Sequence, residues 1–409
     1  MKILLLFIFI FSFCINKKKE ITKADYFYIL TADSYIHHTV FTNQAESAVY
    51  SRSKELISEL GEYHWRGLCH PDKNSIGNCG KFHSNEQGDA TFQTGVYLMS
   101  LAWKYKNTKD SEILLNIEKL LAYYELHQSL NNGGLARSFV ADEYYQKFPE
   151  SEKNGTDIFQ IPEVPGNHMR YRSFVKNGKT YWQRYDMSVD AVSHATAGLY
   201  WVYKFTPYSD RAKNILKKQY DFYIANNWQI KDDSGNILRF GLHDPSINYF
   251  SRVNKIIYEK IVNNSDIYTS VDSAVLNSIS AYNKELRTNY FNSYVAFTQY
   301  LVLNDIGKDI KTGVKKLWNQ VEGDDNFFAN GIYNYIYGNN EKILLKNFPY
   351  WNITYGHSVG TRVYDYSVPL RIRKAYNKWE FSPFESYVIK LNNDDMTGNV
   401  DFLQAYWLY

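Results

Sequence analysis

Residues Asp89–Tyr105 read DATFQTGVYLMSLAWKY, and this stretch is apolar on nearly every side of a helix. A helix that is hydrophobic all round is buried in the protein interior. A short polar turn, Lys106–Lys109, follows it. The next stretch, Asp110–Ser129, places its apolar residues at the spacing of one helix face. The sequence therefore predicts a hairpin made of one buried helix and one half-exposed helix.

The same pairing of helices recurs along the chain. The further pairs are Ser188–Phe205 with Asp210–Asn226, Phe291–Asn304 with Lys308–Gln320 and, more loosely, Asn326–Tyr337 with Asn340–Phe348. Repeated pairs of one buried and one half-exposed helix build two concentric layers. We therefore predict an all-α fold, an (α/α)6 toroid of helical hairpins with long connecting loops. Gly95 and Gly198 in two of the buried helices allow close approach to a neighbour, at about 1 kcal/mol each.

Long polar segments separate the predicted hairpins. The longest, Asn131–Trp182, contains three prolines, and a loop of this length inside a domain is more often functional than idle. Asp232–Asn236 is a predicted turn that begins like a calcium loop. Ile237 stands where such a loop needs glycine, so we expect no calcium there.

The chain begins with the pattern of an export signal. Lys2 is followed by the apolar run Ile3–Phe13, which is shorter than the about 20 residues that span a bilayer. Cys14 after this run resembles the acylated cysteine of a bacterial lipoprotein, although Phe13 stands where such signals prefer a small residue. The alternative is ordinary cleavage that removes Cys14. We predict an exported chain anchored by lipid to a bacterial membrane, in the periplasm or at the cell surface.

Length and composition set further limits. The segments predicted are a signal peptide over 1–13, a lipidated tether and extension over 14–40, and one toroid domain over 41–409. Hydrophobic residues make up 44% of the chain, enough for a large core. The net charge of +3 and the absence of a basic stripe argue against a nucleic-acid partner. The membrane is expected as a partner only through the anchor.

Two further cysteines, Cys69 and Cys79, lie ten residues apart. In an exported chain this spacing predicts one disulfide that closes a small loop. The alternative is a zinc site with His70 and His83, but adjacent ligands suit one tetrahedral ion poorly. We expect neither a metal nor another cofactor.

Three stretches resemble the six-hairpin glycosidase-like superfamily of (α/α)6 toroids. They are Gly88–Tyr97 with Gly134–Ser138, Trp182–Asp190 with His194 and Gly198, and Asp401–Trp407. The resemblance covers most of the mature chain and contains no signature of one enzyme family. It implies a toroid that acts on polysaccharides, as a hydrolase or a lyase, with the substrate at one mouth.

Two aspartates are the candidate catalytic residues. Asp89 and Asp190 each lie at the start of a predicted buried helix, and such starts converge at one mouth of a toroid. Glycoside hydrolysis needs two carboxyl groups on opposite sides of the bond that breaks. The alternative is structural, because Asp also caps helices and is favoured in their first turn. Ser188 is the better cap beside Asp190, which places Asp190 inside the first turn.

Five more residues are candidates for substrate binding. They are Arg137, Trp182, Arg184, Asp186 and His194. Guanidinium groups suit a uronate or a sulfate, although a salt bridge to Asp186 or Asp142 is equally compatible with the sequence. A tryptophan stacks on a sugar ring or packs in a core.

The spacing of Asp186, Asp190 and His194 by four residues predicts one shared face if the helix begins by Asp186. Neighbouring carboxylates raise the pKa of one another, which suits acid catalysis. His194 would then orient Asp190 or bind a sugar hydroxyl, or else be a satisfied core residue.

Three functions remain open at this point. The first is a glycoside hydrolase that uses paired aspartates on an oligo- or polysaccharide, with acidic glycans among the candidates. The second is a polysaccharide lyase on the same scaffold, with a Tyr or His as base and an Arg for the uronate. The third is a surface lipoprotein that binds glycan or protein without catalysis.

Overall fold

The computed structural model describes part of the chain, and all of that part belongs to one compact unit, Ala48–Tyr409. The described residues are 90–146, 153, 171–266, 290–321, 327–338, 361–364, 385–386 and 408. Cys14, Cys69, Cys79 and Asp89 lie outside them, as do the predicted segment boundaries near the N-terminus. The lipid anchor and the disulfide therefore remain predictions.

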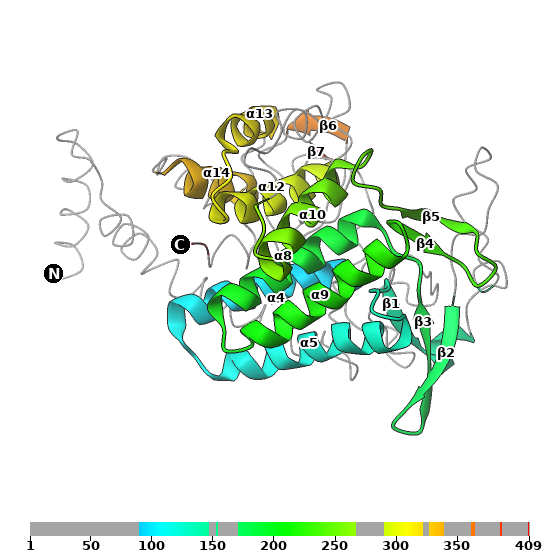
Figure 1. Ribbon diagram of the computed structural model, residues 1–409. Coiled ribbons are helices and arrows are strands. Elements are labelled where there is room, and N and C mark those ends of the chain that lie inside the picture. Colours follow the sequence, from blue (N-terminus) through cyan, green and yellow to red (C-terminus); the bar gives the residue numbers. More distant parts are fainter. Residues whose placement is uncertain are drawn as a thin grey trace, which may run out of the picture. The chain divides into compact units, whose positions relative to one another are not determined.

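Eight helices of eleven or more residues dominate the described residues (Figure 1). They are α4 (Ala90–Thr108), α5 (Glu112–Leu130), α8 (Val189–Phe205), α9 (Ser209–Ala225), α10 (Tyr249–Val262), α12 (Tyr290–Asp305), α13 (Lys311–Val321) and α14 (Phe327–Tyr337). Seven of these were predicted, and their ends differ from the prediction by three residues or fewer. The eighth, α10, was not predicted, and the predicted helix Asn340–Phe348 lies outside the described residues.

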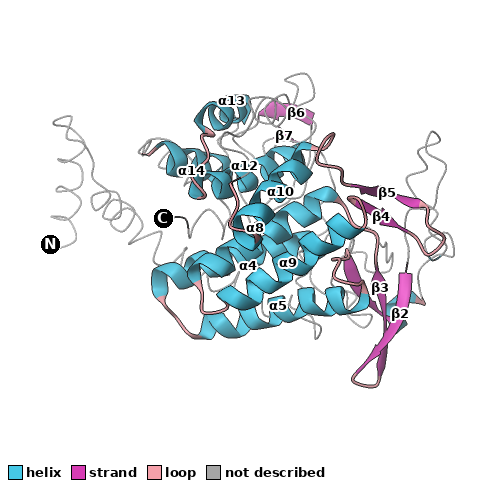
Figure 2. Ribbon diagram, viewed as in Figure 1, coloured by secondary structure: helices cyan, strands magenta, loops and turns pink. Residues whose placement is uncertain are grey.

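Short antiparallel strands accompany the helices (Figure 2). The largest sheet has the order β1-β3-β2, formed by β1 (Ser138–Ala141), β2 (Tyr171–Lys176) and β3 (Lys179–Arg184). Two-stranded sheets join β4 (Gln229–Lys231) to β5 (Ile237–Leu242) and β6 (Thr361–Tyr364) to β7 (Glu385–Ser386). A four-residue helix, α6 (Asp142–Tyr145), follows β1.

The prediction of an all-α (α/α)6 toroid is wrong. Six hairpins require twelve helices, whereas the described residues hold eight long helices together with three small sheets, so the fold is mixed. The segment Asn131–Trp182, predicted as a loop, contributes the strands of the largest sheet. The pattern of one hairpin reports the burial of its own two helices and does not fix how many hairpins surround it.

Helices α4 and α8 lie side by side and run in the same direction. The two helices touch at three positions along their length, and the residue numbers of both partners rise from the first position to the last. The ring of Phe92 lies 4.0 Å from that of His194, and a Cβ at Gly95 would lie 2.5 Å from the carbonyl of His194. Farther along, the rings of Trp103 and Trp201 lie 4.7 Å apart. The first turns of the two helices therefore lie at one end, which we call the amino end.

Helix α12 runs parallel to this pair. The Tyr294 ring stacks on His194 at 4.9 Å near the amino end. At the opposite end, Asp305 accepts hydrogen bonds from Tyr200 and Lys204. Three buried helices thus begin at the same end of the unit.

Helices α5 and α9 cover this layer on one side (Figure 1). Gln128 Nε2 donates to the Ile215 carbonyl at 2.7 Å, and Arg211 Nε donates to Glu125 at 2.7 Å. Both α5 and α9 are half-exposed, and each has a buried stripe of residues that faces the layer, as its sequence predicts.

The sheet β1-β3-β2 is held at the amino end by backbone hydrogen bonds. Thr91 N donates to the Arg137 carbonyl at 3.0 Å, and Arg137 N donates to the Arg184 carbonyl at 2.9 Å. The hairpin between β2 and β3 turns at Asn177 and Gly178, with φ values of 53° and 76°. Asn-Gly is the preferred pair for a two-residue turn with positive φ. The sheet thereby brings the end of β3 to the start of α8.

Candidate functional site

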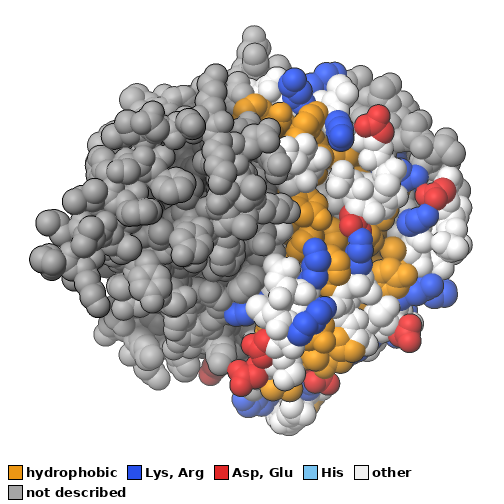
Figure 3. Space-filling model, turned by 90° about the vertical axis from the view of Figure 1, so that its left-hand side faces the viewer, with side chains coloured by type: hydrophobic (Ala, Val, Ile, Leu, Met, Phe, Trp, Pro, Cys, Tyr) orange, Lys and Arg blue, Asp and Glu red, His pale blue; other side chains and the backbone are white. Residues whose placement is uncertain are grey.

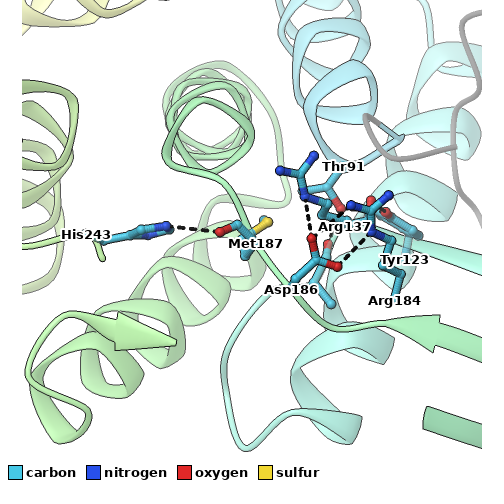
Figure 4. Close-up of polar contacts among 8 residues, drawn as sticks. Thr91, Tyr123, Arg137, Arg184, Asp186, Met187 and His243 are labelled. Atoms are coloured by element: carbon cyan, nitrogen blue, oxygen red, sulfur yellow. Dashed lines mark hydrogen bonds and ion pairs between the residues drawn. The ribbon is translucent and has the colours of Figure 1, made fainter. Parts of the chain in front are cut away.

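Asp186 lies between two guanidinium groups at the amino end (Figure 4). Its Oδ1 accepts a hydrogen bond from Arg184 Nε at 2.7 Å, and its Oδ2 accepts one from Arg184 Nη2 at 3.0 Å. Arg137 Nε lies 3.0 Å from the same Oδ2. Asp186, Arg137 and Arg184 are only 1%, 8% and 4% exposed. The ion-pair alternative considered from the sequence is thus present for both arginines.

Three elements bring these charges together. Arg137 directly precedes β1, Arg184 ends β3, and Asp186 lies in the connection from β3 to α8. A buried charge is tolerated when it is paired and hydrogen-bonded. Two cations share one carboxylate, so these three side chains carry a net positive charge. The cluster fastens the sheet to the start of α8.

The first turn of α4 is tied to the same cluster (Figure 4). The Thr91 hydroxyl lies 2.6 Å from the Tyr123 hydroxyl, and it also donates to the Ala136 carbonyl. Tyr123 on α5 reaches the Arg137 carbonyl at 3.3 Å. Residues from α4 and α5 therefore hold the backbone that carries Arg137, which pairs with Asp186 ahead of α8. We call residues 183–190, which lead from β3 into α8, the site segment.

Asp190 lies in the first turn of α8 and is half-buried. Helix α8 begins at Val189, with Ser188 in an extended conformation as its N-cap residue. Asp190 falls inside the first turn, as the sequence predicts. Within the part of the chain that the structure describes, its carboxylate makes no hydrogen bond or ion pair. A carboxylate at this position is favoured by the helix dipole.

The shared helical face expected for Asp186, Asp190 and His194 is not formed. Asp186 precedes the first residue of α8 by three positions, and its carboxylate is turned to the arginines. The prediction failed because the helix begins later than Asp186. The Asp186 carboxylate is therefore paired with Arg137 and Arg184 and does not share a helical face with Asp190 and His194.

His194 is a core residue of the helix layer. It is 1% exposed and lies between the rings of Phe92 and Tyr294. Its Nδ1 donates to the backbone carbonyl of Asp190 at 3.0 Å, so it does not orient the carboxylate. Among the described residues, its Nε2 has no hydrogen-bond partner. Burial lowers the pKa of His194 to about 3, which keeps the ring neutral.

Trp182 on β3 packs within the sheet and against α6. Its ring stacks on Tyr145 at 3.8 Å, and its Nε1 donates to Asp142 Oδ1 at 2.7 Å. This hydrogen bond lowers the pKa of Asp142. One ring face is thus used for packing, while the side chain as a whole is half-buried. A role in stacking on a sugar stays a prediction.

Two further histidines contact the site segment and were not predicted. His127 Nδ1 lies 3.0 Å from Gln183 Nε2, and His243 Nε2 lies 3.1 Å from the Met187 carbonyl. Both are buried. His127 lies at i+4 from Tyr123 on the buried face of α5, which was a usable signal. His243 follows β5, and nothing in its sequence neighbourhood indicates its partner.

The described residues show neither a metal centre nor a membrane span. No group of three or more His, Cys, Asp or Glu residues in the described ranges is placed to hold a metal ion. No helix among the described residues has both the length and the apolar character needed to cross a bilayer. On the face drawn in Figure 3, Lys and Arg side chains are interspersed with acidic and hydrophobic ones, so its described part has no basic stripe.

Comparison with known proteins finds no relative. No family model matches the chain, and no curated protein or solved structure matches it.

Proposed function

We propose that this chain is a carbohydrate-active enzyme that hydrolyses glycosidic bonds outside the cytoplasm, with Asp190 as one of its two carboxyl groups. The observation that carries the proposal is the half-buried Asp190 carboxylate, which has no side-chain partner among the described residues. Asp190 lies in the first turn of the buried helix α8, at the amino end. Most buried or half-buried carboxylates are held by a cation or a cap, as Asp186 is.

The parallel course of α4 and α8 supports a second carboxyl group nearby. Ala90 begins α4 at the same end as Asp190, and Asp89 directly precedes Ala90 in the sequence. Asp89 is therefore the second carboxyl group of the proposal. In hydrolysis, one group protonates the oxygen of the leaving sugar, and the other activates water or attacks the anomeric carbon. Water supplies the hydroxyl and the proton that the two products gain.

The buried arginine cluster fits the same proposal. Arg137 and Arg184 give the amino end a positive charge that Asp186 only partly offsets. Such a field favours a substrate with carboxylate or sulfate groups. The predicted export signal, Lys2 with Ile3–Phe13, is compatible with a polysaccharide substrate outside the cytoplasm.

The lyase alternative receives less support from the geometry. A lyase needs a base that reaches the C5 proton of a uronate. His194 is 1% exposed and enclosed by Phe92 and Tyr294, so its Nε2 is out of reach of a polymer. His194 is therefore a poor candidate for that base, and the half-buried Asp190 carboxylate favours the hydrolase.

A glycan panel tests the proposal. The full chain is incubated with neutral and acidic polysaccharides, and each reaction is assayed for new reducing ends and for ultraviolet-absorbing unsaturated products. The proposal expects new reducing ends without unsaturated products. Unsaturated products would establish a lyase instead, and glycan binding without any cleavage would leave only a binding protein.

A further inference from the structure

Asp142 has one carboxylate oxygen that is held by two donors from its neighbours. Trp182 Nε1 donates to Oδ1 at 2.7 Å, and Gln146 Nε2 donates to the same Oδ1 at 2.9 Å. Within the described part of the chain, no donor reaches Oδ2 and Asp142 forms no ion pair. The carboxylate is therefore held in one orientation, and its second oxygen keeps its capacity to accept hydrogen bonds.

Three elements meet at this carboxylate. Val140 of β1 pairs with Trp182 of β3, and Asp142 begins α6 two residues after Val140. Gln146 follows α6, and its backbone N–H donates to the Asp142 carbonyl at 2.9 Å. The corner where β1, α6 and β3 meet thus brings an acid, an amide and an indole together. We call Asp142, Tyr145, Gln146 and Trp182 the corner cluster.

The aromatic part of the corner cluster is a fixed stack. The rings of Trp182 and Tyr145 lie 3.8 Å apart with 14° between their planes, and Tyr171 of β2 meets Tyr145 at 5.2 Å. Tyr145 is 8% exposed, whereas Trp182 and Asp142 are half-buried. A buried ring therefore supports a partly exposed indole, and the hydrogen bond to Asp142 fixes the indole in its plane.

This combination of groups suits an uncharged sugar ring. The C–H face of a pyranose packs on an indole, which offers a large apolar surface. Its hydroxyl groups donate to carboxylate and amide oxygens, and hydrogen bonds to an ionised acceptor are the stronger kind. The hydrogen bonds from Trp182 and Gln146 lower the pKa of Asp142, so the carboxylate is ionised at neutral pH. A uronate or sulfate placed against Oδ2 would be repelled.

The corner cluster lies beside the arginines of the amino end. Trp182 and Arg184 are two residues apart on β3, so their side chains leave the same face of the sheet, roughly 7 Å apart along the strand. Gln183 between them leaves the other face, where it contacts His127 of α5. The corner cluster therefore borders the ion pairs that precede α8.

We propose that the corner cluster is a binding subsite for an uncharged pyranose unit of a glycan, which packs on the exposed part of Trp182 and donates from its hydroxyl groups to Asp142 Oδ2. The choice of a sugar as the ligand rests on the proposed function. Asp142 takes no part in bond cleavage, and it holds one unit of the glycan while Asp190 acts on another. The alternative is that Asp142 only holds Trp182 in place.

Asp142→Asn separates these two roles. Because both donors meet Oδ1, the amide oxygen of the variant should take that position, and an NH2 group should replace Oδ2. Trp182 stays in place, while the free acceptor becomes a donor. Isothermal titration of the full chain with neutral hexasaccharides of glucose, mannose and xylose, and with hexagalacturonate as the charged comparison, measures the effect. We expect at least one neutral hexasaccharide to bind the wild-type chain, and the variant to bind it about tenfold more weakly.

Glu143→Gln is the matched control. Glu143 is exposed in the same short helix, and among the described residues it forms no hydrogen bond to Trp182. This substitution removes the same charge, so affinity should change by less than about twofold, because an exposed charge is screened by solvent. An equal loss in both variants, an unchanged affinity in Asp142→Asn, or a wild-type chain that binds none of the neutral hexasaccharides would overturn the subsite.

Product analysis of the same mixtures separates the subsite from the proposed function. If the wild-type chain cleaves the sugar, Asp142→Asn should raise KM about tenfold and leave kcat nearly unchanged, because Asp142 is not at the bond that breaks. Binding that depends on Asp142 without any cleavage would support the subsite and refute the hydrolase. Cleavage with an unchanged KM in Asp142→Asn would refute the subsite and leave the hydrolase standing.

Discussion

Gly95 and Gly198 face one another between α4 and α8, so closely that a Cβ at Gly198 would overlap the carbonyl oxygen of Gly95. A Cβ at Gly95 would lie 2.5 Å from the His194 carbonyl and 2.6 Å from the Ala195 nitrogen. Both contacts are with backbone atoms, which cannot rotate away as a side chain does. The two glycines therefore set the distance between the helices that carry Asp190 and Ala90.

Gly198→Ala tests this contact. Helix propensity alone would make alanine more favourable by about 1 kcal/mol. The backbone overlap should instead lower the free energy of unfolding by about 2–3 kcal/mol, as seen for overpacked cores. Urea unfolding gives the sign of the change directly. Gly178→Ala is the control, because it sits in a turn at φ 76° with nothing near its Cβ position; it should cost about 1 kcal/mol. A more stable Gly198→Ala would refute the close contact.

Asp186→Asn should destabilise the protein strongly. The change leaves Arg137 and Arg184 buried without their shared carboxylate. Loss of one partner from a buried ion pair typically costs about 3–5 kcal/mol. Thermal or urea unfolding measures the loss.

A surface ion pair supplies the control for this change. Lys217 and Asp221 pair at 2.5 Å on the exposed side of α9. Asp221→Asn should cost less than about 0.5 kcal/mol, because exposed pairs are screened by solvent. Equal effects of the two substitutions would show that Asp186 does not hold the sheet to α8.

The protein should become less stable as the pH falls below about 6.5, before its carboxylates titrate. The lowered pKa values of His127 and His194 mean that the unfolded chain binds protons on these rings below about pH 6.5, while the folded chain does not. The free energy of unfolding therefore decreases as pH falls from 6.5 toward 3. At pH 5.5 the expected loss is about 1.4 kcal/mol for each ring. Urea unfolding at pH 7.5 and 5.5 measures it, and His194→Phe should lose its share; identical stability at both pH values would contradict burial of neutral rings.

The helix layer could be predicted because each buried helix carries its own signal. Residues in α4, α8 and α12 are apolar on nearly every side, so burial follows from local sequence alone. Helix α10 offered a signal that was overlooked, with Phe250, Val253 and Ile257 on one face. The prediction that the hairpins close into a toroid was wrong, because closure depends on contacts between hairpins, and no local sequence pattern indicates these contacts.

The sheet at the amino end was missed although one signal was present. Asn177-Gly178 stands between two short runs rich in aromatic and β-branched residues, a pattern typical of a β-hairpin. The ion pairs of Asp186 were foreseen as one of two alternatives, since Arg184 is only two residues away in sequence. The contacts of His127 and His243 with the site segment were not foreseen. Each histidine lies 56 residues in sequence from the residue of the segment that it contacts.

Asp190→Asn is the most direct test of the proposed function. On a glycan that the wild-type chain cleaves, turnover is measured beside the thermal midpoint of unfolding for wild type, Asp190→Asn and Asp89→Asn. If Asp190 is a catalytic carboxyl group, its variant should keep the fold and lose several orders of magnitude in turnover, on the order of 5 kcal/mol in barrier. If it only complements the dipole of α8, the change costs about 1 kcal/mol of stability or less and leaves turnover intact. A stable, fully active Asp190→Asn variant would contradict the proposal.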